Sequence, residues 1–126
     1  MDYKVLLIAP EDDFRHKVAD RLADCGLDVR SEADPDEAVR VLADRGAEVV
    51  LFAAGDEHDK DLALLARLLA AAPRAGIILL EPGGDVDFAM QARRHGVFDD
   101  ILIPFEMSDL LARIEQAGRA ARGPQR

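Results

Sequence analysis

The sequence contains one cysteine, few aromatic residues and no long uninterrupted hydrophobic run. Cys25 alone cannot form an internal disulfide, which is compatible with a reducing compartment. The leucine-rich stretch 62–72 is interrupted by Arg67, so the sequence predicts no membrane-spanning helix. The first residues lead directly into Val5 and lack the charged start, long apolar segment and cleavage site of a signal peptide. We therefore expect a cytoplasmic protein.

What is present is the composition of one globular domain. Of the 126 residues, 49% are hydrophobic, 33% charged and only 5% aromatic, which predicts a core built mainly from Leu, Val, Ile and Ala. A chain of this size can bury such a core without a disulfide or a metal. The formal net charge of -9 predicts that nucleic acid and anionic membranes repel the chain. We expect a domain over residues 1–118, with residues 119–126 as the end of the last helix and a tail or linker.

The segment 48–55 is the middle one of five strand-like segments. β-Branched and aromatic apolar residues run almost continuously from Val49 to Phe52, a pattern typical of a parallel strand covered by helices on both faces. Ligands of open parallel sheets gather beyond the carboxyl ends of the strands. Here the residue after Phe52 is Ala53, whose side chain carries no reactive atom. This absence is the main sequence clue to function.

The strand-like segments alternate with helix-like segments. Phe14, Val18 and Leu22 recur every four residues, which predicts an amphipathic helix. Asp34 followed by Pro35 is typical of a helix start. The alternation predicts an α/β fold with a doubly wound, flavodoxin-like parallel sheet of order 2-1-3-4-5. The predicted strands comprise residues 3–9, 27–31, 48–55, 76–81 and 100–103, and the predicted helices residues 14–26, 35–46, 62–69, 86–95 and 108–121.

Several segments spread over nearly the whole chain carry a resemblance to a known family. These are residues 4–8, 14–15, 48–52, 96–100 and 104–105. Together they resemble the receiver domain of bacterial response regulators, which implies a place in two-component signal transduction. In such receivers an acidic pair after the first strand holds Mg²⁺, and an Asp at the end of the third strand accepts a phosphoryl group. A hydroxyl residue after the fourth strand and a Lys before the Pro of the fifth then contact the phosphate.

The resemblance breaks at every position that carries this chemistry. The acidic pair corresponds to Ala9 and Pro10, and the phosphoacceptor to Ala53. The hydroxyl position holds Glu81, the lysine position holds Ile103, and the aromatic residue that usually changes rotamer corresponds to Asp100. The charge of a glutamate would repel an incoming phosphoryl group. The resemblance therefore implies a degenerate receiver, or pseudo-receiver, that is not phosphorylated in the usual way.

An acidic cluster follows the first strand and leaves a rival interpretation open. Glu11, Asp12 and Asp13 could bind Mg²⁺ weakly and serve a phosphoacceptor receiver or a phosphotransfer protein. The commoner meaning of acids before a helix is capping, here by Asp12 or Asp13, so we expect no metal and no cofactor. Flavin binding is disfavoured because residues 9–14 lack a loop rich in hydroxyls and glycine. Cys25 is expected to be a partly buried small residue.

We expect a protein-interaction module that does not depend on phosphorylation and is not an enzyme. Its role would be docking, localisation or dimerisation, through a protein partner or a second copy of the chain. If the alanines of the fourth helix face the sheet, Phe88 points toward solvent; the alternative is that it folds back over its own loop. The chain also resembles the atypical receivers that precede the ParA/MinD-like ATPase of pilus-assembly localisation proteins, which implies an ATPase or other output domain downstream. The contact face that the resemblance implies comprises Phe88, Met90, Arg93, Met107 and Arg113.

Overall fold

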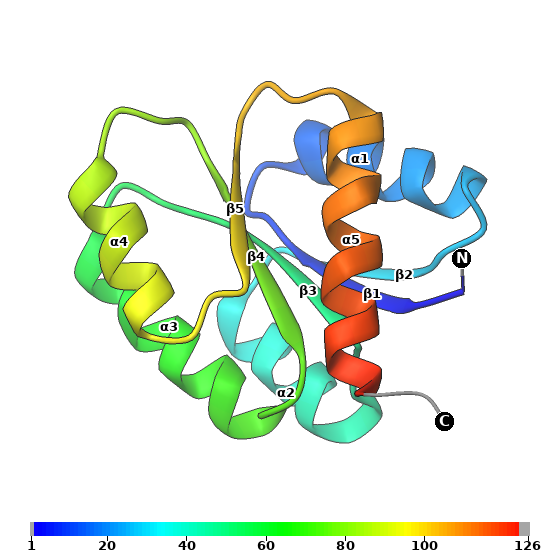
Figure 1. The fold of residues 1–126 in the computed structure, drawn as a ribbon, viewed down its shortest axis with the longest axis horizontal. Helices are drawn as coiled ribbons and strands as arrows, with labels where there is room; N and C mark the ends of the chain where they lie inside the picture. The colour runs from blue at the N-terminus through cyan, green and yellow to red at the C-terminus, as the bar shows by residue number, and fades with distance from the viewer. Residues whose placement is uncertain (1, 124–126) are drawn as a thin grey trace.

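The structure is a computed structural model, which describes residues 2–123. Five parallel strands in the order β2-β1-β3-β4-β5 form a sheet with helices on both faces (Figure 1). The predicted fold class and strand order are confirmed. The strands are β1 (Lys4–Ile8), β2 (Asp28–Glu32), β3 (Val49–Ala53), β4 (Gly76–Glu81) and β5 (Asp99–Leu102). The helices are α1 (Asp12–Asp24), α2 (Pro35–Arg45), α3 (His58–Ala71), α4 (Val86–Arg94) and α5 (Met107–Arg122).

Each face of the sheet has its own hydrophobic core. Successive side chains of a strand point to opposite faces, so Leu7 and Leu51 pack under α1 and α5, whereas Leu6 and Val50 pack under α2, α3 and α4. Strand β3 lies between β1 and β4 and is buried on both faces, as its continuous apolar pattern predicts. The carboxyl ends of the strands and the loops after them lie together at one edge of the sheet (Figure 1).

Helix α5 packs against the sheet at unusually short distance because two glycines remove the intervening side chains. A Cβ added at Gly118 would lie 2.5 Å from Cε1 of Tyr3, and one added at Gly76 would lie 2.7 Å from Cβ of Ala117. The end of the helix is held by Arg122, whose guanidinium carbon lies 4.3 Å from the centre of the Tyr3 ring. Arg122 also pairs with Glu48 and, at 3.0 Å, with Asp2. The last turn of α5 is therefore fixed to the amino end of the sheet.

The structure corrects three local predictions. Helix α3 begins at His58 rather than at residue 62, because the acidic residues of the expected loop form its first turn, where the helix dipole favours them. The N-cap of α1 is Glu11 rather than Asp12 or Asp13, which lie inside the first turn. Cys25 is exposed rather than partly buried, because it is the C-cap of α1 and lies beyond the buried face of that helix.

The other predicted boundaries of helices and strands differ from those of the structure by a few residues. The predicted division after residue 118 falls inside α5, and residues 124–126 of the predicted tail lie outside the described residues. The predicted cap at Asp34 is confirmed, since its carboxylate accepts a hydrogen bond from the backbone N–H of Asp36 at 3.2 Å. Within residues 2–123, no helix is both long enough and apolar enough to cross a membrane.

Candidate functional site

The carboxyl edge of β1 and β3 carries apolar side chains. Ala9 is buried directly after β1, and the next residue, Pro10, is exposed. Ala53 ends β3, is half-buried and lies in register with Leu80 of β4. None of these three side chains has an oxygen, whereas Mg²⁺ binds oxygen ligands. The residues at these positions therefore do not fit the metal of a phosphorylated receiver.

The acidic residues after β1 are not arranged around a vacant cation site. The Arg15 guanidinium turns back into this loop, donating to the Ala9 carbonyl oxygen at 2.9 Å and to Asp12 Oδ1 at 2.7 Å. Asp12 thus neutralises a largely buried arginine, and Glu11 and Asp13 are exposed. Across the part of the chain that the structure describes, no three His, Cys, Asp or Glu side chains are placed to hold a metal ion. The geometry gives no support to the Mg²⁺ interpretation.

A cavity of about 590 Å³ opens beside Ala53, between β1, β3, α2 and α3. Two cations at its rim are already paired: Lys60 lies 2.7 Å from Glu57, and Arg67 lies 2.8 Å from Asp36. The cavity is large enough for a small molecule but offers a phosphate little unpaired positive charge. Its apolar lining includes Ile8, Pro10, Pro35, Phe52, Ala53 and Leu64.

The loop after β3 is held by a buried carboxylate. Asp61 on α3 is 7% exposed, and both of its carboxylate oxygens accept from the backbone N–H of Gly55, at 3.1 and 3.2 Å. Burial raises the pKa of the Asp61 carboxyl group, and the Gly55 hydrogen bond opposes this increase only in part. Asp61 therefore fixes the backbone of the loop rather than presenting a nucleophile at the position of Ala53.

The position that holds a lysine in receiver domains is occupied here by Ile103, whose side chain points toward the core. Ile103 is half-buried, packs against the core under α1 and α5, and precedes Pro104 through a cis peptide bond. Its backbone N–H donates to the carbonyl oxygen of Glu81 at 2.8 Å, which continues the pairing of β4 with β5. An aliphatic side chain in this place cannot neutralise a phosphoryl group.

Two of the substituted positions, Glu81 and Asp100, lie next to one another. Glu81 ends β4 and is 7% exposed. Strand register places Asp100 opposite Leu79, so the side chains of Asp100 and Glu81 emerge on the same face of the sheet. Burial and the neighbouring Asp100 carboxylate raise the pKa of Glu81. Because this proximity depends on strand register, position in the sequence alone did not reveal it.

The predicted contact face is only partly exposed. Phe88 is 3% exposed and stacks on His58 with ring centres 3.9 Å apart, so the expectation that it points toward solvent is wrong. The physical reason is that Phe88 and Ala92, four residues apart, form the buried side of α4. Met90 and Arg93 are exposed, whereas Met107 and Arg113 are half-buried.

Two further apolar side chains, which the sequence pattern did not single out, are exposed on the same surface. Val86 at the start of α4 is 73% exposed, and Leu102 at the end of β5 is 56% exposed. A four-residue spacing links Val86 to Met90, and that spacing was the available signal. We call Val86, Met90, Arg93, Leu102 and Arg113 the α4–β5–α5 surface.

Four charged side chains form a network on this surface. Arg93 donates to Asp99 at 2.9 Å and to Asp100 at 3.0 Å. Arg113 forms an ion pair with Asp99, with 3.4 Å between Nε of the arginine and Oδ2 of the aspartate. The geometry is not that of a hydrogen bond, and within residues 2–123 this buried nitrogen has no hydrogen-bond partner. The network joins α4, β5 and α5.

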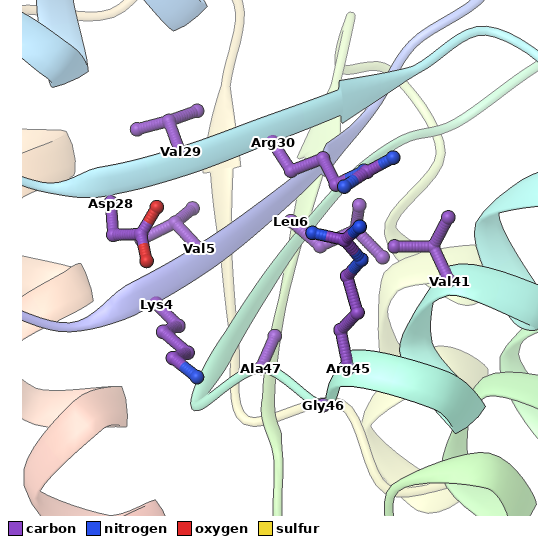
Figure 2. A pocket seen from close by; sticks show the side chains of 10 residues that line it. All are labelled: Lys4, Val5, Leu6, Asp28, Val29, Arg30, Val41, Arg45, Gly46 and Ala47. Carbon is purple, nitrogen blue, oxygen red and sulfur yellow. The ribbon is translucent and has the colours of Figure 1, made fainter.

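A smaller pocket of about 210 Å³ lies at the other edge of the sheet, near the amino ends of β1 and β2. Figure 2 shows the side chains of Arg30 and Arg45 extending toward one another above Leu6. Arg30 pairs with Glu32 at 3.6 Å. This pocket takes no part in the carboxyl-edge site.

Comparisons with known proteins agree with the fold and with the resemblance to receiver domains. No protein-family model matches the chain. The chain is 27% identical over 116 residues to the putative response regulator NtrX-like of Rickettsia bellii, covering 90% of this chain and 24% of the relative. It is 31% identical over 122 residues to the C4-dicarboxylate transport transcriptional regulatory protein DctD of Rhizobium meliloti, covering 97% and 26%. The chain thus spans about a quarter of the length of these relatives.

Among solved structures, the chain is similar to the receiver domain of NtrX from Brucella abortus. The two are 28% identical and superpose with a TM-score of 0.79, over 90% of this chain and 96% of that one. The match therefore covers nearly a complete domain on both sides.

Proposed function

We propose that this chain, which belongs to the receiver-domain family of response regulators, is a protein-interaction module that works without phosphorylation. The observation that carries the proposal is Ala53 at the carboxyl end of β3, where a methyl group stands in the place of a nucleophilic carboxylate. A methyl group cannot accept a phosphoryl group. The module has no catalytic role of its own and acts in the cytoplasm.

The surroundings of Ala53 support the same proposal. Phosphoryl transfer depends on cations that offset the charge of the phosphate. Ile103 supplies no charge, and Arg15 already donates to Ala9 and Asp12. Restoring the chemistry would require changes at the carboxyl ends of β1, β3 and β5 together, so we infer a role that no longer depends on it.

The α4–β5–α5 surface is the proposed contact surface. Exposed apolar side chains beside paired charges are typical of an interaction site. Arg93 and Arg113 of this surface pair with Asp99 and Asp100 beside it, so a second copy related by two-fold symmetry could exchange these ion pairs without leaving a charge unpaired. We therefore take a second copy of the chain as the proposed partner.

Intact-mass measurement tests independence from phosphorylation. The protein is incubated with a small phosphodonor and Mg²⁺, and its mass is compared with that of an untreated sample. We expect no adduct. A stable single phosphoryl adduct would favour the alternative function, a Mg²⁺-dependent phosphoacceptor that uses the acidic cluster of Glu11, Asp12 and Asp13.

Light scattering over a range of concentrations tests the surface. We expect a concentration-dependent dimer that Met90→Asp weakens by at least tenfold in Kd, because the new carboxylate would be buried in an apolar contact. Ala66→Asp is the matched control, since it introduces the same charge at an exposed position of α3. A monomer at every concentration, or equal effects of both variants, would contradict dimerisation through this surface.

A more specific form of the proposed function is that the chain precedes a ParA/MinD-like ATPase of pilus assembly and localises that ATPase. The length of the two curated relatives shows that similar domains occur within longer proteins. Sequencing the gene beyond residue 126 tests this version directly, and an output domain of another class would contradict it.

A further inference from the structure

The pocket near the amino ends of β1 and β2 is lined by an excess of positive charge. Its charged side chains are three cations, Lys4, Arg30 and Arg45, and one carboxylate, Asp28. The chain as a whole has a formal net charge of -9, with 25 acidic residues against 16 lysines and arginines. A cluster of cations is therefore unexpected on this protein, and its field favours an anion at this pocket.

Strand register places most of these side chains on one face of the sheet. Lys4 lies in register with Asp28, and Leu6 lies in register with Arg30. Alternate residues of a strand point to the same face, which here is the face that carries Leu6 into the core under α2, α3 and α4. Arg45 reaches the same pocket from the last turn of α2. The three cations thus come from three different elements.

Nearby carboxylates leave most of this positive charge unpaired. Within residues 2–123, the side chains of Lys4 and Arg45 form no ion pair, and Arg30 pairs with Glu32 only at 3.6 Å. Figure 2 shows Asp28 apart from the two guanidinium groups, which extend toward one another above Leu6. Like charges that approach one another repel, so an anion between them would lower their energy.

The dipole of α2 explains only part of this arrangement. The carbonyl end of a helix favours cations, which accounts for an arginine in the last turn of α2. Arg30 lies instead on the edge strand β2, and Lys4 begins β1. Sheets have only small net dipoles. Three cations at one pocket therefore exceed what the end of the helix requires.

We propose that this pocket binds the phosphate group of a small organic phosphate. A phosphate dianion would neutralise the excess of two positive charges, and guanidinium groups bind phosphate through paired N–H···O hydrogen bonds. Leu6, Val41 and Ala47 line the same pocket and offer an apolar contact to the organic part of the ligand. The volume of about 210 Å³ is below the roughly 300–1,000 Å³ of pockets for drug-sized ligands, so the ligand is small.

Amide NMR with phenyl phosphate tests the site. The titration is made at pH 7, where a phosphate monoester is largely a dianion, and at low ionic strength, where screening is weak. We expect saturable shifts of the amide signals of residues 28–30 and 45–47. Sodium chloride at the same ionic strength should not produce them. Shifts that do not saturate, or equal shifts with chloride, would overturn the proposal.

Methyl phosphate tests the apolar contact, because it carries the same charge with almost no organic part. We expect phenyl phosphate to bind on the order of tenfold more tightly, since its ring would cover Leu6, Val41 and Ala47. Equal affinities of the two esters would overturn the assignment of the organic part to this pocket.

Two variants and a matched control test the cations. Arg30→Gln and Arg45→Gln should each weaken binding of phenyl phosphate by about tenfold, because each removes a charged donor. Arg94→Gln removes the same charge from an exposed position of α4 outside the pocket, so it should bind as the wild type does. Equal weakening by all three variants would show an effect of overall charge alone and would overturn the site.

The test is independent of the proposed function. All three substituted side chains are exposed, so the variants are expected to fold, and their amide spectra verify this. The pocket lies at the opposite end of the strands from Ala53, and the titration needs neither a partner nor phosphoryl transfer. A failed titration would therefore overturn this site and leave the intact-mass and light-scattering results as they stand.

Discussion

The close approach of α5 to the sheet predicts that Gly118→Ala destabilises the protein, although alanine favours helices. A Cβ at this position would lie 2.5 to 2.7 Å from three atoms of the Tyr3 ring. Carbon atoms in ordinary contact are about 3.5–4.0 Å apart, so helix and ring must separate by roughly 1 Å. The ring cannot tilt freely because it is buried and Arg122 lies over it.

The expected magnitude is the difference between two opposing effects. Forcing an extra carbon into a packed site costs about 1–3 kcal/mol. Replacing glycine by alanine inside a helix gains about 0.8–1.0 kcal/mol. We expect a net loss of roughly 0–2 kcal/mol in the free energy of unfolding, measured by urea denaturation at constant m-value.

A double-mutant cycle separates the two effects. Tyr3→Val removes the ring atoms that lie near Gly118, and by itself it costs about 2–4 kcal/mol. In that background Gly118→Ala should stabilise the protein by up to about 1 kcal/mol, because only the helix preference remains. The sign of the substitution should therefore reverse. Equal effects in the two backgrounds, or stabilisation in both, would refute the steric argument.

Three further predictions concern single side chains of the same fold. Burial raises the pKa of Asp61 above its ordinary value of 3.8, so its contribution to stability is present below 3.8 and is lost as pH rises through the raised pKa. Urea denaturation of Asp61→Asn should show a smaller loss of stability between pH 3 and pH 8 than the wild type, and equal losses would contradict this prediction. The hydrogen bond from Arg122 lowers the pKa of Glu48, so the contribution of Glu48 to stability is present above the ordinary value of 4.5 and is lost as pH falls through the lowered pKa. In thermal melts, Glu48→Gln should therefore have a lower melting temperature than the wild type at pH 7, and the difference should be smaller at pH 3. Ala53→Asp should still yield no phosphoryl adduct by intact mass, because the lysine and the acidic pair remain absent; an adduct would show that the acceptor alone was missing.

The fold was predictable from the sequence because its signals are local and strong. The apolar run from Val49 to Phe52 identified the central strand, and Asp34 with Pro35 identified the start of α2. Helix α3 was predicted too short because charged residues before Leu62 resemble a loop, although acids also suit the first turn of a helix. Local pattern thus predicted which elements exist better than where they begin.

The replacement of the phosphorylation residues at the candidate site was predictable from the sequence, but the new contacts made there were not. Ala53 and Ile103 could be recognised because the resemblance to receiver domains assigns a phosphoacceptor and a lysine to these positions. The burial of Phe88 depends on which side of α4 faces the sheet, and the contact with His58 joins residues 30 positions apart in the chain. The proximity of Glu81 to Asp100 requires the register of β4 against β5. Such relations between elements are set by tertiary packing, which a single sequence does not specify.

The substitutions at the carboxyl edge are of two chemical kinds, and the difference bears on what the site can still bind. Replacements at Ala9, Ala53 and Ile103 are apolar, so they remove reactivity without adding charge. Glu81 and Asp100 instead bring two acids together at the end of the sheet. An incoming phosphate would be repelled by this pair, and Arg93 already neutralises Asp100 from the side of α4. The carboxyl edge has thus lost the groups that react with a phosphoryl group and has gained negative charge that disfavours binding of a phosphate.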